Sequence, residues 1–339
     1  MSDPIREARE LVRDDLERFE ATLVEALRPQ APYLSETDYE IYRRGKKLRP
    51  LMLLLSARAS TGDALEVLPE KVIKSAVSLE MLHVATLIHD DIVDQAPKRR
   101  GLETVYSERG AERAVLIGDM QFIQAIRGFA DGIDAEKDMQ LVRMVLDAGF
   151  KVCCGELDEI MTDPAWDSEL LLHRYFETID RKTSALFALA CESGATLVDA
   201  RTRITVYLSR FGRRFGKAFQ IMDDIFDFVR TEAAAGKLPG TDLQQGRLTL
   251  PVLYILDSLP PGHPVRRLLN REPCTGEEVA AAVAEVCRSD GLLRAYSDAR
   301  RAALEANDFL RELPQTRHRD ALEAICMHVI DRDLQRADG

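Results

Sequence analysis

Two stretches of the sequence repeat one pattern of carboxylates, apolar-x-Asp-Asp-x-x-Asp. They read "LIHDDIVDQ" at 87–95 and "QIMDDIFDF" at 220–228, with 133 positions between corresponding aspartates. The aspartates are Asp90, Asp91 and Asp94 in the first copy and Asp223, Asp224 and Asp227 in the second. On a helix the first and third aspartate of each copy share a face, because residues four apart are neighbours. Each copy therefore predicts an acidic edge on a helix that is otherwise apolar.

Such acidic edges are costly in a partly buried site unless cations are present. Two carboxylates ~6 Å apart repel by about 3 kcal/mol at an effective dielectric constant near 20. Oxygen ligands select hard divalent ions, and Mg²⁺ keeps several waters and completes its shell with phosphate oxygens of a substrate. The two copies thus predict Mg²⁺ bound jointly with a diphosphate. The alternative is that each trio is a solvated helix face, but two copies set in apolar helices favour the metal site.

Basic residues accompany the acidic edges. Arginine binds phosphate oxygens bidentately, and lysine acts as a mobile point charge. The basic residues of interest are Lys46 and Arg49 in "RRGKKLRP", Arg99 and Arg100 after Pro97, Lys182 before Thr183, and Lys237 and Arg247 in a glycine-rich loop. Any single pair is as well explained by ordinary surface charge. Their occurrence together predicts two bound diphosphates, one held through metal and one through cations alone.

The elements that must position these residues are helices. Apolar residues recur at helical spacing over 5–28, 50–60, 70–94, 111–130, 136–163, 168–198, 202–230, 249–258, 277–289, 291–312 and 317–336. Strand signals are nearly absent, and the breaks are short segments rich in proline and glycine. The pattern predicts one all-α domain over 1–339, with a surface loop and a short helix at 259–276.

Composition and charge narrow the function class. The 339 residues are 46% hydrophobic and 30% charged, which is ordinary for a globular protein. The net charge of −11 argues against non-specific binding to nucleic acid or anionic lipid. No apolar run approaches the ~18 residues of a membrane span, and the charged N-terminus is unlike a secretory signal, so we expect a cytoplasmic protein. The six cysteines show no CxxC spacing and are expected to be free thiols.

With these motifs the sequence resembles the trans-isoprenyl diphosphate synthases of the polyprenyl synthetase family. The resemblance runs from "GKKLRP" (45–50) to the C-terminal segment "ELPQTRHRDALEAICMHVIDRD" (312–333). Between them lie "IGD" (117–119), "GE" (155–156), "KTS" (182–184), "FQIMDD" (219–224) and "GTD" (240–242), besides the first aspartate motif with its Arg-Arg-Gly. The ordered pair of aspartate motifs is the most specific part of the match.

The resemblance implies a large antiparallel helical bundle, a homodimer, and a central cavity with the two aspartate motifs facing each other across it. It implies three Mg²⁺ ions on an allylic diphosphate, held by Asp90, Asp91, Asp94, Asp223 and Asp224 with Asp227 in support. It also implies that Arg99, Lys182 and Lys237 bind this diphosphate, that Lys46, Arg49, His83 and Arg100 bind isopentenyl diphosphate without metal, and that Thr183 and Gln220 line the path of the cation. A lone helical histidine is more often structural, which is the alternative for His83.

The implied reaction is the condensation of an allylic diphosphate with isopentenyl diphosphate. Positive charge would stabilise the departing diphosphate, and the double bond of isopentenyl diphosphate would attack the resulting carbocation. A proton would then be lost, and apolar helix faces would exclude the water that quenches the cation.

Three side chains depart from the family pattern. Glu159 stands where a glutamine is common, and it adds an acid near the expected site. Gln121 and Gln124 stand where the family is more apolar, and they could face a partner subunit or make the product pocket more polar. The sequence leaves the roles of all three open.

Small residues before the first motif bear on product length. In the family, bulk at the fifth and fourth positions before that motif stops chain growth, and here these positions are Ala85 and Thr86, with Leu82 one turn deeper. The pattern favours a product longer than twenty carbons. The alternative floors of the tunnel are Met120, Phe122 and Phe150.

Two other functions share parts of this pattern. A class I terpene cyclase, or an enzyme that elongates and then cyclises, would have the same fold and one aspartate motif, but a cyclase normally lacks the Lys46-Arg49 and Arg99-Arg100 pairs. A non-catalytic subunit of a heteromeric synthase typically loses one aspartate motif, and this sequence keeps both.

Overall fold

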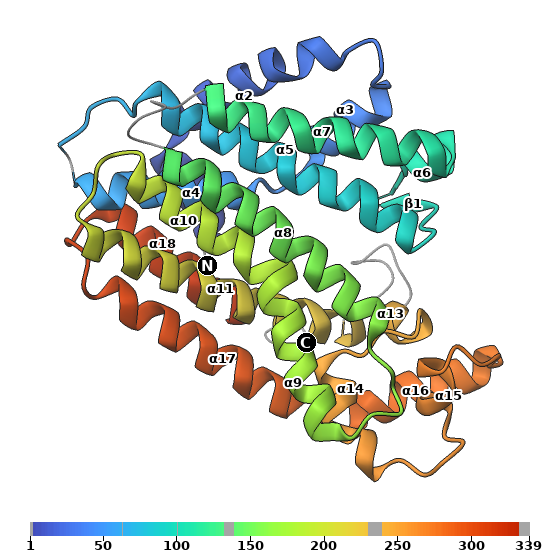
Figure 1. Cartoon of the computed structure of the whole chain (residues 1–339). Helices are drawn as coiled ribbons and strands as arrows, with labels where there is room; N and C mark the ends of the chain where they lie inside the picture. The colour runs from blue at the N-terminus through green and yellow to red at the C-terminus, as the bar shows by residue number, and fades with distance from the viewer. Residues whose placement is uncertain (1–2, 63, 100, 132–138, 230–238, 332–339) are drawn as a thin grey trace. The chain divides into compact units, whose positions relative to one another are not determined.

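The computed structural model describes residues 3–62, 64–99, 101–131, 139–229 and 239–331. These residues form helices almost throughout, with one hairpin of two short strands (Figure 1). The all-α fold expected from the sequence is therefore confirmed. The chain divides into two compact units, of which unit 1 is 1–149, 186–212 and 308–325 and unit 2 is 150–185, 213–307 and 326–339. The single-domain organisation stays a prediction, and each unit is described by itself.

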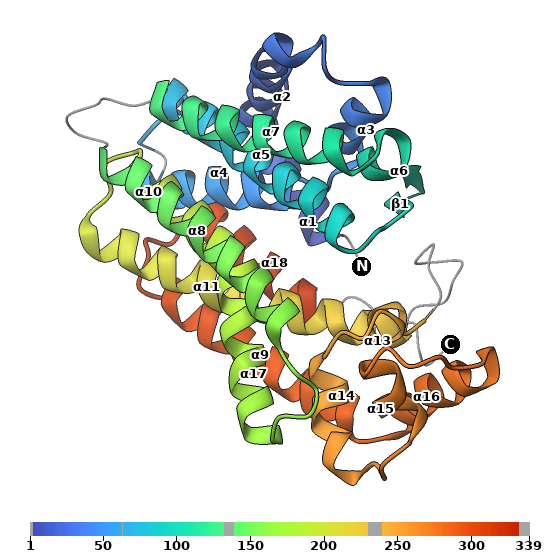
Figure 2. The ribbon, with the colours of Figure 1, turned by 45° about the vertical axis from the view of Figure 1, so that its right-hand side comes forward.

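Unit 1 is built around the long helix α5. Its own elements are α1 (Pro4–Leu11), α2 (Arg13–Leu27), η1 (Arg28–Gln30), α3 (Glu36–Arg44), α4 (Leu48–Thr61), α5 (Glu70–Val93), β1 (Lys98–Arg99), β2 (Leu102–Glu103), α6 (Val105–Arg109) and α7 (Ala111–Asp131). Helices α2, α4 and α7 all pack on α5, and Figures 1 and 2 both show α5 and α7 side by side. The first aspartate motif ends this central helix.

Helix α5 is apolar on nearly every side. It is long and apolar enough to cross a membrane by length and composition, but 78% of its most apolar window is buried inside the protein. A helix that is hydrophobic all round and surrounded by other helices is the core of a large protein. The burial of α5 explains its composition without a membrane.

The helix starts follow from local sequence signals. Asp3 caps α1 by accepting a hydrogen bond from the backbone of Ile5, with Pro4 in the first turn. Ser35 and Asp38 form a capping box at the start of α3, a helix that the periodicity did not predict. The helix expected over 5–28 is interrupted at Val12, which separates α1 from α2.

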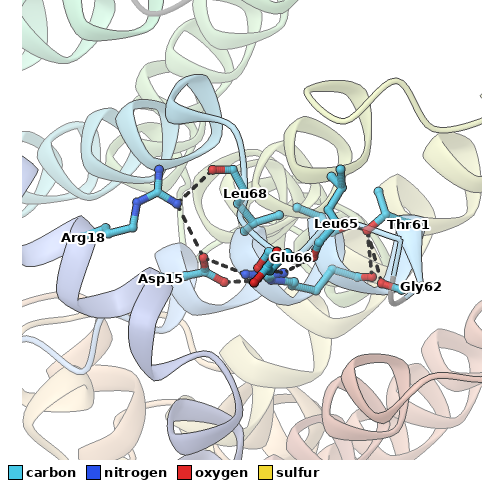
Figure 3. A network of polar contacts seen from close by, with 9 residues as sticks. Asp15, Arg18, Thr61, Gly62, Leu65, Glu66 and Leu68 are labelled. Atoms are coloured by element: carbon cyan, nitrogen blue, oxygen red, sulfur yellow. Dashed lines mark hydrogen bonds and ion pairs between the residues drawn. The ribbon is translucent and has the colours of Figure 1, made fainter.

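A partly buried arginine, Arg58, ties α2 and α4 to the segment that leads into α5, and Figure 3 labels its partners Asp15, Leu65 and Glu66. The guanidinium of Arg58 donates to both carboxylate oxygens of Asp15, at 2.8 and 3.0 Å, and Asp15 is 2% exposed. The same group donates to the carbonyl oxygens of Leu65 (2.6 Å) and Glu66 (3.2 Å). Arg18 donates to the carbonyl of Leu68 at 2.8 Å. These bonds fix the loop before α5 and thereby its start.

Unit 2 contains the second aspartate motif. Elements within it are α9 (Ser168–Ile179), the π-helical turn η2 (Asp180–Ser184), α13 (Thr241–Gln244), α14 (Leu250–Ile255), η3 (Leu256–Ser258), α15 (Pro264–Leu269) and α16 (Gly276–Arg288). Helices with residues in both units are α8 (Met139–Met161), α10 (Ala185–Thr196), α11 (Thr202–Val229), α17 (Gly291–Leu310) and α18 (Arg317–Asp331). The short helix expected in the loop 259–276 is confirmed as α15.

Candidate active site

The first aspartate motif occupies the C-terminal end of α5. Asp90 and Asp91 lie in its last turn, and Asp94 is the C-cap residue, still in helical conformation, with its N–H bonded to the carbonyl of Asp90 at 2.8 Å. Asp91 is buried, and its Oδ1 accepts a hydrogen bond from Nε of Arg99 at 2.8 Å. Burial raises the pKa of the Asp91 carboxyl, Arg99 opposes this shift, and the two neighbouring aspartates add to it.

A hairpin brings Arg99 back to Asp91. Strands β1 and β2 pair antiparallel, and Gly101 takes a positive φ of 79° at the turn, where an L side chain would be strained. Thr104 fixes the hairpin to α5, because its side chain donates to the carbonyl of Ala96 at 2.6 Å. The sequence placed Arg99 after the helix but did not predict the strands. Arg100 lies outside the described residues.

The expected binding residues for isopentenyl diphosphate lie at the start of α4 and on α5. Lys46 is exposed, and the guanidinium of Arg49 lies 4.6 Å from the ring centre of Phe187, a cation–π distance. Lys47, between them, adopts a left-handed conformation and forms an ion pair with Glu20. Lys47 thus has a structural role, whereas Lys46 and Arg49 remain candidates for binding.

The positions expected to control product length lie on the inner part of α5. Leu82 and Ala85 are fully buried, whereas Thr86 is half-buried and donates to the carbonyl of His83 at 2.7 Å. His83 itself is half-buried. These placements fit residues that face other helices, and the role in chain length stays a prediction.

The alternative floors of the tunnel have different surroundings. The ring of Phe122 packs against Gly149, where an added Cβ would lie 2.8 Å from Cζ. Met120 is half-buried, whereas Phe150 is 73% exposed. Phe150 therefore lies on an outer face of the chain.

The two amides that depart from the family pattern have partners within unit 1. Gln121 is buried, and its Oε1 accepts a hydrogen bond from the hydroxyl of Tyr42 at 2.6 Å. Gln124 donates to the carbonyl of Ala26 at 3.5 Å. Both amides thus tie α7 to neighbouring segments of the same unit, and this gives them a structural role.

The second aspartate motif lies near the end of α11, and Asp224 is its buried member. Oδ2 of Asp224 accepts hydrogen bonds from the hydroxyl of Tyr175 (2.7 Å) and the backbone N–H of Leu250 (3.2 Å). Oδ1 accepts one from Nε2 of Gln220 at 3.1 Å. Burial raises the pKa of the Asp224 carboxyl to about 7, although Tyr175 and Gln220 oppose the shift. The hydrogen bonds hold the carboxylate in one orientation. Burial destabilises its ionised form, and nearby positive charge would stabilise that form.

The other two aspartates of this motif differ from Asp224. Asp223 is exposed. Asp227 is half-buried and holds the start of α13, because its Oδ2 accepts the N–H of Asp242 (3.0 Å) and its carbonyl accepts the N–H of Gly240 (2.7 Å). These bonds give Asp227 a structural role, and its expected contact with the metal site stays a prediction.

A π-helical turn positions the Lys-Thr-Ser segment. The turn η2 interrupts the helix expected over 168–198, between α9 and α10. Thr183 donates to Oε1 of Gln220 at 2.7 Å, and Gln220 in turn donates to Asp224. π-helical turns occur as single turns within α-helices, frequently at functional sites. The structure thus brings together Thr183, Gln220 and Asp224, three residues that the sequence analysis selected.

Lys182 lies between two carboxylates of α8. Its Nζ donates to Oε1 of Glu156 (2.8 Å) and to Oε2 of Glu159 (2.9 Å). Gly155 makes this approach possible, because an added Cβ would lie 2.7 Å from the backbone nitrogen of Lys182. Glu159 therefore points toward the site residue Lys182. The sequence alone left the direction of this side chain open. Lys237 lies outside the described residues.

The acidic residues fit a hard divalent cation by the chemistry of their oxygens. Each motif has one buried aspartate whose pKa is raised by burial, so nearby positive charge would favour the ionised form. Within the described ranges, no three His, Cys, Asp or Glu side chains already converge on one ion position. Mg²⁺ does not require such a cage, because it takes one or two carboxylates together with waters and substrate phosphates.

Some residues of the site were not found from the sequence. Tyr175 lies 49 positions from Asp224. A buried tyrosine needs a hydrogen-bond partner, but the sequence does not show which residue that is. Glu156 was noted only as part of a short motif, and Asp242 only within "GTD". No spacing rule links these residues to their partners, because the contacts depend on how the helices pack.

Comparisons with known proteins agree with this fold. The family model described as polyprenyl synthetase matches residues 31–286. Heptaprenyl diphosphate synthase component 2 of Bacillus subtilis is 32% identical over 94% of this chain and 88% of its own length. Nonaprenyl diphosphate synthase of Mycobacterium tuberculosis is 33% identical over 95% and 93%. The crystal structure of a polyprenyl synthase from Caulobacter crescentus, complexed with calcium and isoprenyl diphosphate, has a TM-score of 0.85 at 27% identity, over 97% of this chain and 98% of that one.

An all-α fold with two acidic helix ends, and lysine and arginine residues beside them, is that of an isoprenyl diphosphate synthase. The match to the family model covers most of the chain. The chain belongs to the polyprenyl synthetase family. It is an enzyme, a trans-prenyltransferase that condenses an allylic diphosphate with isopentenyl diphosphate, and these relatives do not favour a terpene cyclase or a non-catalytic subunit.

Proposed function

We propose that this trans-prenyltransferase makes a polyprenyl diphosphate longer than twenty carbons, with Mg²⁺ as its metal. The observation that carries the site is the pair of aspartate motifs, each with one buried, hydrogen-bonded carboxylate, Asp91 and Asp224. The product length is supported by small, buried Ala85 and by relatives named as heptaprenyl, octaprenyl and nonaprenyl diphosphate synthases.

The metal-binding residues in this proposal are carboxylates. They are Asp90, Asp91, Asp94, Asp223 and Asp224, and we propose that they hold three Mg²⁺ ions. Bound Mg²⁺ would neutralise charge on the departing diphosphate. Relatives crystallised with calcium and isoprenyl diphosphate support a divalent ion.

The protein's own side chains would bind and orient the substrates. Arg99 and Lys182 would bind the allylic diphosphate, as would Lys237. In the described structure Arg99 is paired with Asp91 of the first motif, and Lys182 is paired with Glu156 and Glu159 of α8, both through charge-assisted hydrogen bonds. Lys46, Arg49, His83 and Arg100 would bind the diphosphate of isopentenyl diphosphate.

The hydrogen-bonded series from Thr183 through Gln220 to Asp224 has a positioning role in this proposal. Thr183 donates to Gln220, which leaves the amide of Gln220 directed at the carboxylate. The series fixes the orientation of Asp224 and places polar oxygens beside the path of the allylic cation. Apolar residues on the same helices, such as Met222 and Phe226, are buried and would exclude water.

We propose that the protein forms a homodimer. Helix α8 exposes a stripe of large apolar residues at spacings of seven, four, seven and four, and these are Met139, Leu146, Phe150, Leu157 and Met161. This spacing is close to the 3.6 residues of an α-helical turn and puts the five side chains on one face, so that the helix can pair with its own copy about a two-fold axis. Phe150→Glu should therefore shift the mass measured by light scattering from dimer to monomer. A monomeric wild type would refute the homodimer, and the name "component 2" of one relative makes a second protein the alternative partner.

Product analysis tests the proposed function. The purified protein is incubated with Mg²⁺, farnesyl diphosphate and isopentenyl diphosphate, and the extracted lipids are analysed by mass spectrometry. The expected products are prenyl diphosphates longer than twenty carbons. Shorter diphosphates would contradict the length, hydrocarbons would indicate a cyclase, and unchanged substrates would indicate a non-catalytic subunit.

A further inference from the structure

Glu159 contacts two cations of unit 2 at once. Its Oε2 accepts a hydrogen bond from Nζ of Lys182 at 2.9 Å, and its Oε1 lies 3.5 Å from Nε of Arg247. All three side chains are partly buried, so water screens their charges less than on an open surface. Glu159 therefore bridges a residue on the π-helical turn and a residue after α13.

The bridge belongs to a larger network that, among the residues that the structure describes, has three carboxylates and two cations. Glu156 contacts Lys182 through both oxygens, at 2.6 and 2.8 Å, and Asp242 accepts a hydrogen bond from Arg247 at 3.3 Å. The contacts thus join the carboxylates of Glu156, Glu159 and Asp242 to the cations of Lys182 and Arg247. Replacing Glu159 by a neutral residue would make the two signs equal in this network.

The network also reaches the second aspartate motif. The backbone N–H of Asp242 donates to Oδ2 of Asp227 at 3.0 Å, so the residue that holds Arg247 is itself fixed to α11. Arg247 is thus held on one side by a fixed aspartate and on the other by Glu159. Asp242 is tied to α11 through its own backbone, whereas Glu159 reaches Arg247 from α8 with its side chain.

We propose that Glu159 is a positioning residue that competes with the diphosphate of the allylic substrate for Lys182 and Arg247. The inference rests on the proposed contact between Lys182 and this diphosphate. A diphosphate is a stronger acceptor for a lysine and an arginine than one carboxylate, since it has more charge and more oxygens. Binding of the diphosphate would displace Glu159 from both cations, and release of the diphosphate would restore the bridge.

The expected consequence is that Glu159 weakens substrate binding. Glu159→Gln keeps a side chain of the same shape and an oxygen that can accept from Lys182, but it removes the competing charge. The KM for the allylic diphosphate should fall by about two- to fivefold, the order expected from one partly exposed charge pair. The inhibition constant of inorganic diphosphate should fall by the same factor, and the Mg²⁺ concentration for half-maximal rate should not change. Glu159→Asp, which keeps the charge, should stay closer to the wild type.

Glu177→Gln is a matched control. Glu177 is also partly buried, and its carboxylate pairs with two arginines, Arg174 at 3.6 Å and Arg181 at 3.5 Å. Its substitution should leave the KM for the allylic diphosphate unchanged. If the loss of a negative charge acted only through the stability of the protein, the KM for the allylic diphosphate would change by a similar factor in both variants.

Several results would overturn the inference. An unchanged or higher KM in Glu159→Gln would show that Glu159 does not compete with substrate, and a changed Mg²⁺ requirement would place it among the metal ligands. Lys182→Met should raise the KM, and an unchanged value would remove the contact on which the inference depends. If the wild type fails to elongate at all, the proposed function is refuted, but the competition by Glu159 can still be tested. Calorimetric titration with inorganic diphosphate and Mg²⁺ then compares the affinities of the wild type and Glu159→Gln.

Discussion

The buried pair of Asp15 and Arg58 gives the sharpest test of the packing in unit 1. Arg58→Met keeps much of the aliphatic length of the side chain but removes two hydrogen bonds to Asp15 and two to backbone carbonyls. Asp15 is 2% exposed, and a guanidinium nitrogen of Arg18 lies 3.8 Å from its Oδ1. Removing one partner of a buried ion pair costs about 3–5 kcal/mol because the other charge stays buried. For a unit of this size each kcal/mol lowers Tm by roughly 2–4 °C, so we expect a decrease of about 6–20 °C.

Thermal unfolding followed by circular dichroism measures this effect, with Arg28→Met as the matched control. Arg28 pairs with Glu25 at 2.6 Å, but its side chain is 72% exposed, so its loss should cost no more than about 1 kcal/mol. The double variant Asp15→Asn with Arg58→Met should be less destabilised than the sum of the single variants, because the uncompensated charge is gone. If Arg58→Met unfolds within about 2 °C of the wild type, the reasoning from burial is refuted.

Three further predictions concern the site. Asp91→Ala and Asp223→Ala should each lower kcat by orders of magnitude with an unchanged circular dichroism spectrum, and wild-type rates in either variant would contradict the metal assignment. Burial raises the pKa of Asp224 from 3.8 to about 7, so the folded protein binds an extra proton between these values. In EDTA, the stability of the wild type relative to Asp224→Asn should therefore fall as pH rises from 4 to 7, and a constant difference in Tm would count against a buried, ionised carboxylate. Ala85→Phe should shorten the product seen by mass spectrometry, and an unchanged product would put the floor of the tunnel elsewhere.

Most helices could be predicted from the sequence because their apolar faces are periodic. The helices expected over 70–94 and 202–230 are α5 and α11, within a residue at their C-terminal ends. Helix α3 was missed because its surface is largely polar, although the Ser35–Asp38 capping box was a readable signal. The hairpin after the first motif was missed because strands of two residues are too short to show any alternation.

The aspartate motifs could be predicted because both the residue type and the spacing lie within one helix. Contacts between elements could not, since they depend on packing that no local pattern encodes. Tyr175 on Asp224 is one such contact, and Glu159 on Lys182 is another. The sequence showed that Glu159 was unusual, and only the position of its carboxylate between two cations suggested what it does.

The π-helical turn at Asp180–Ser184 makes this part of the chain sensitive to length more than to composition. Loss of one residue there would allow ordinary α-helical hydrogen bonding throughout, and the isolated helix would be at least as regular. The side chains within the turn itself would, however, change direction, because the turn is where the extra residue is accommodated. Thr183 would then no longer meet Gln220. Homologous sequences aligned over this turn should therefore keep its length as well as Lys182 and Thr183.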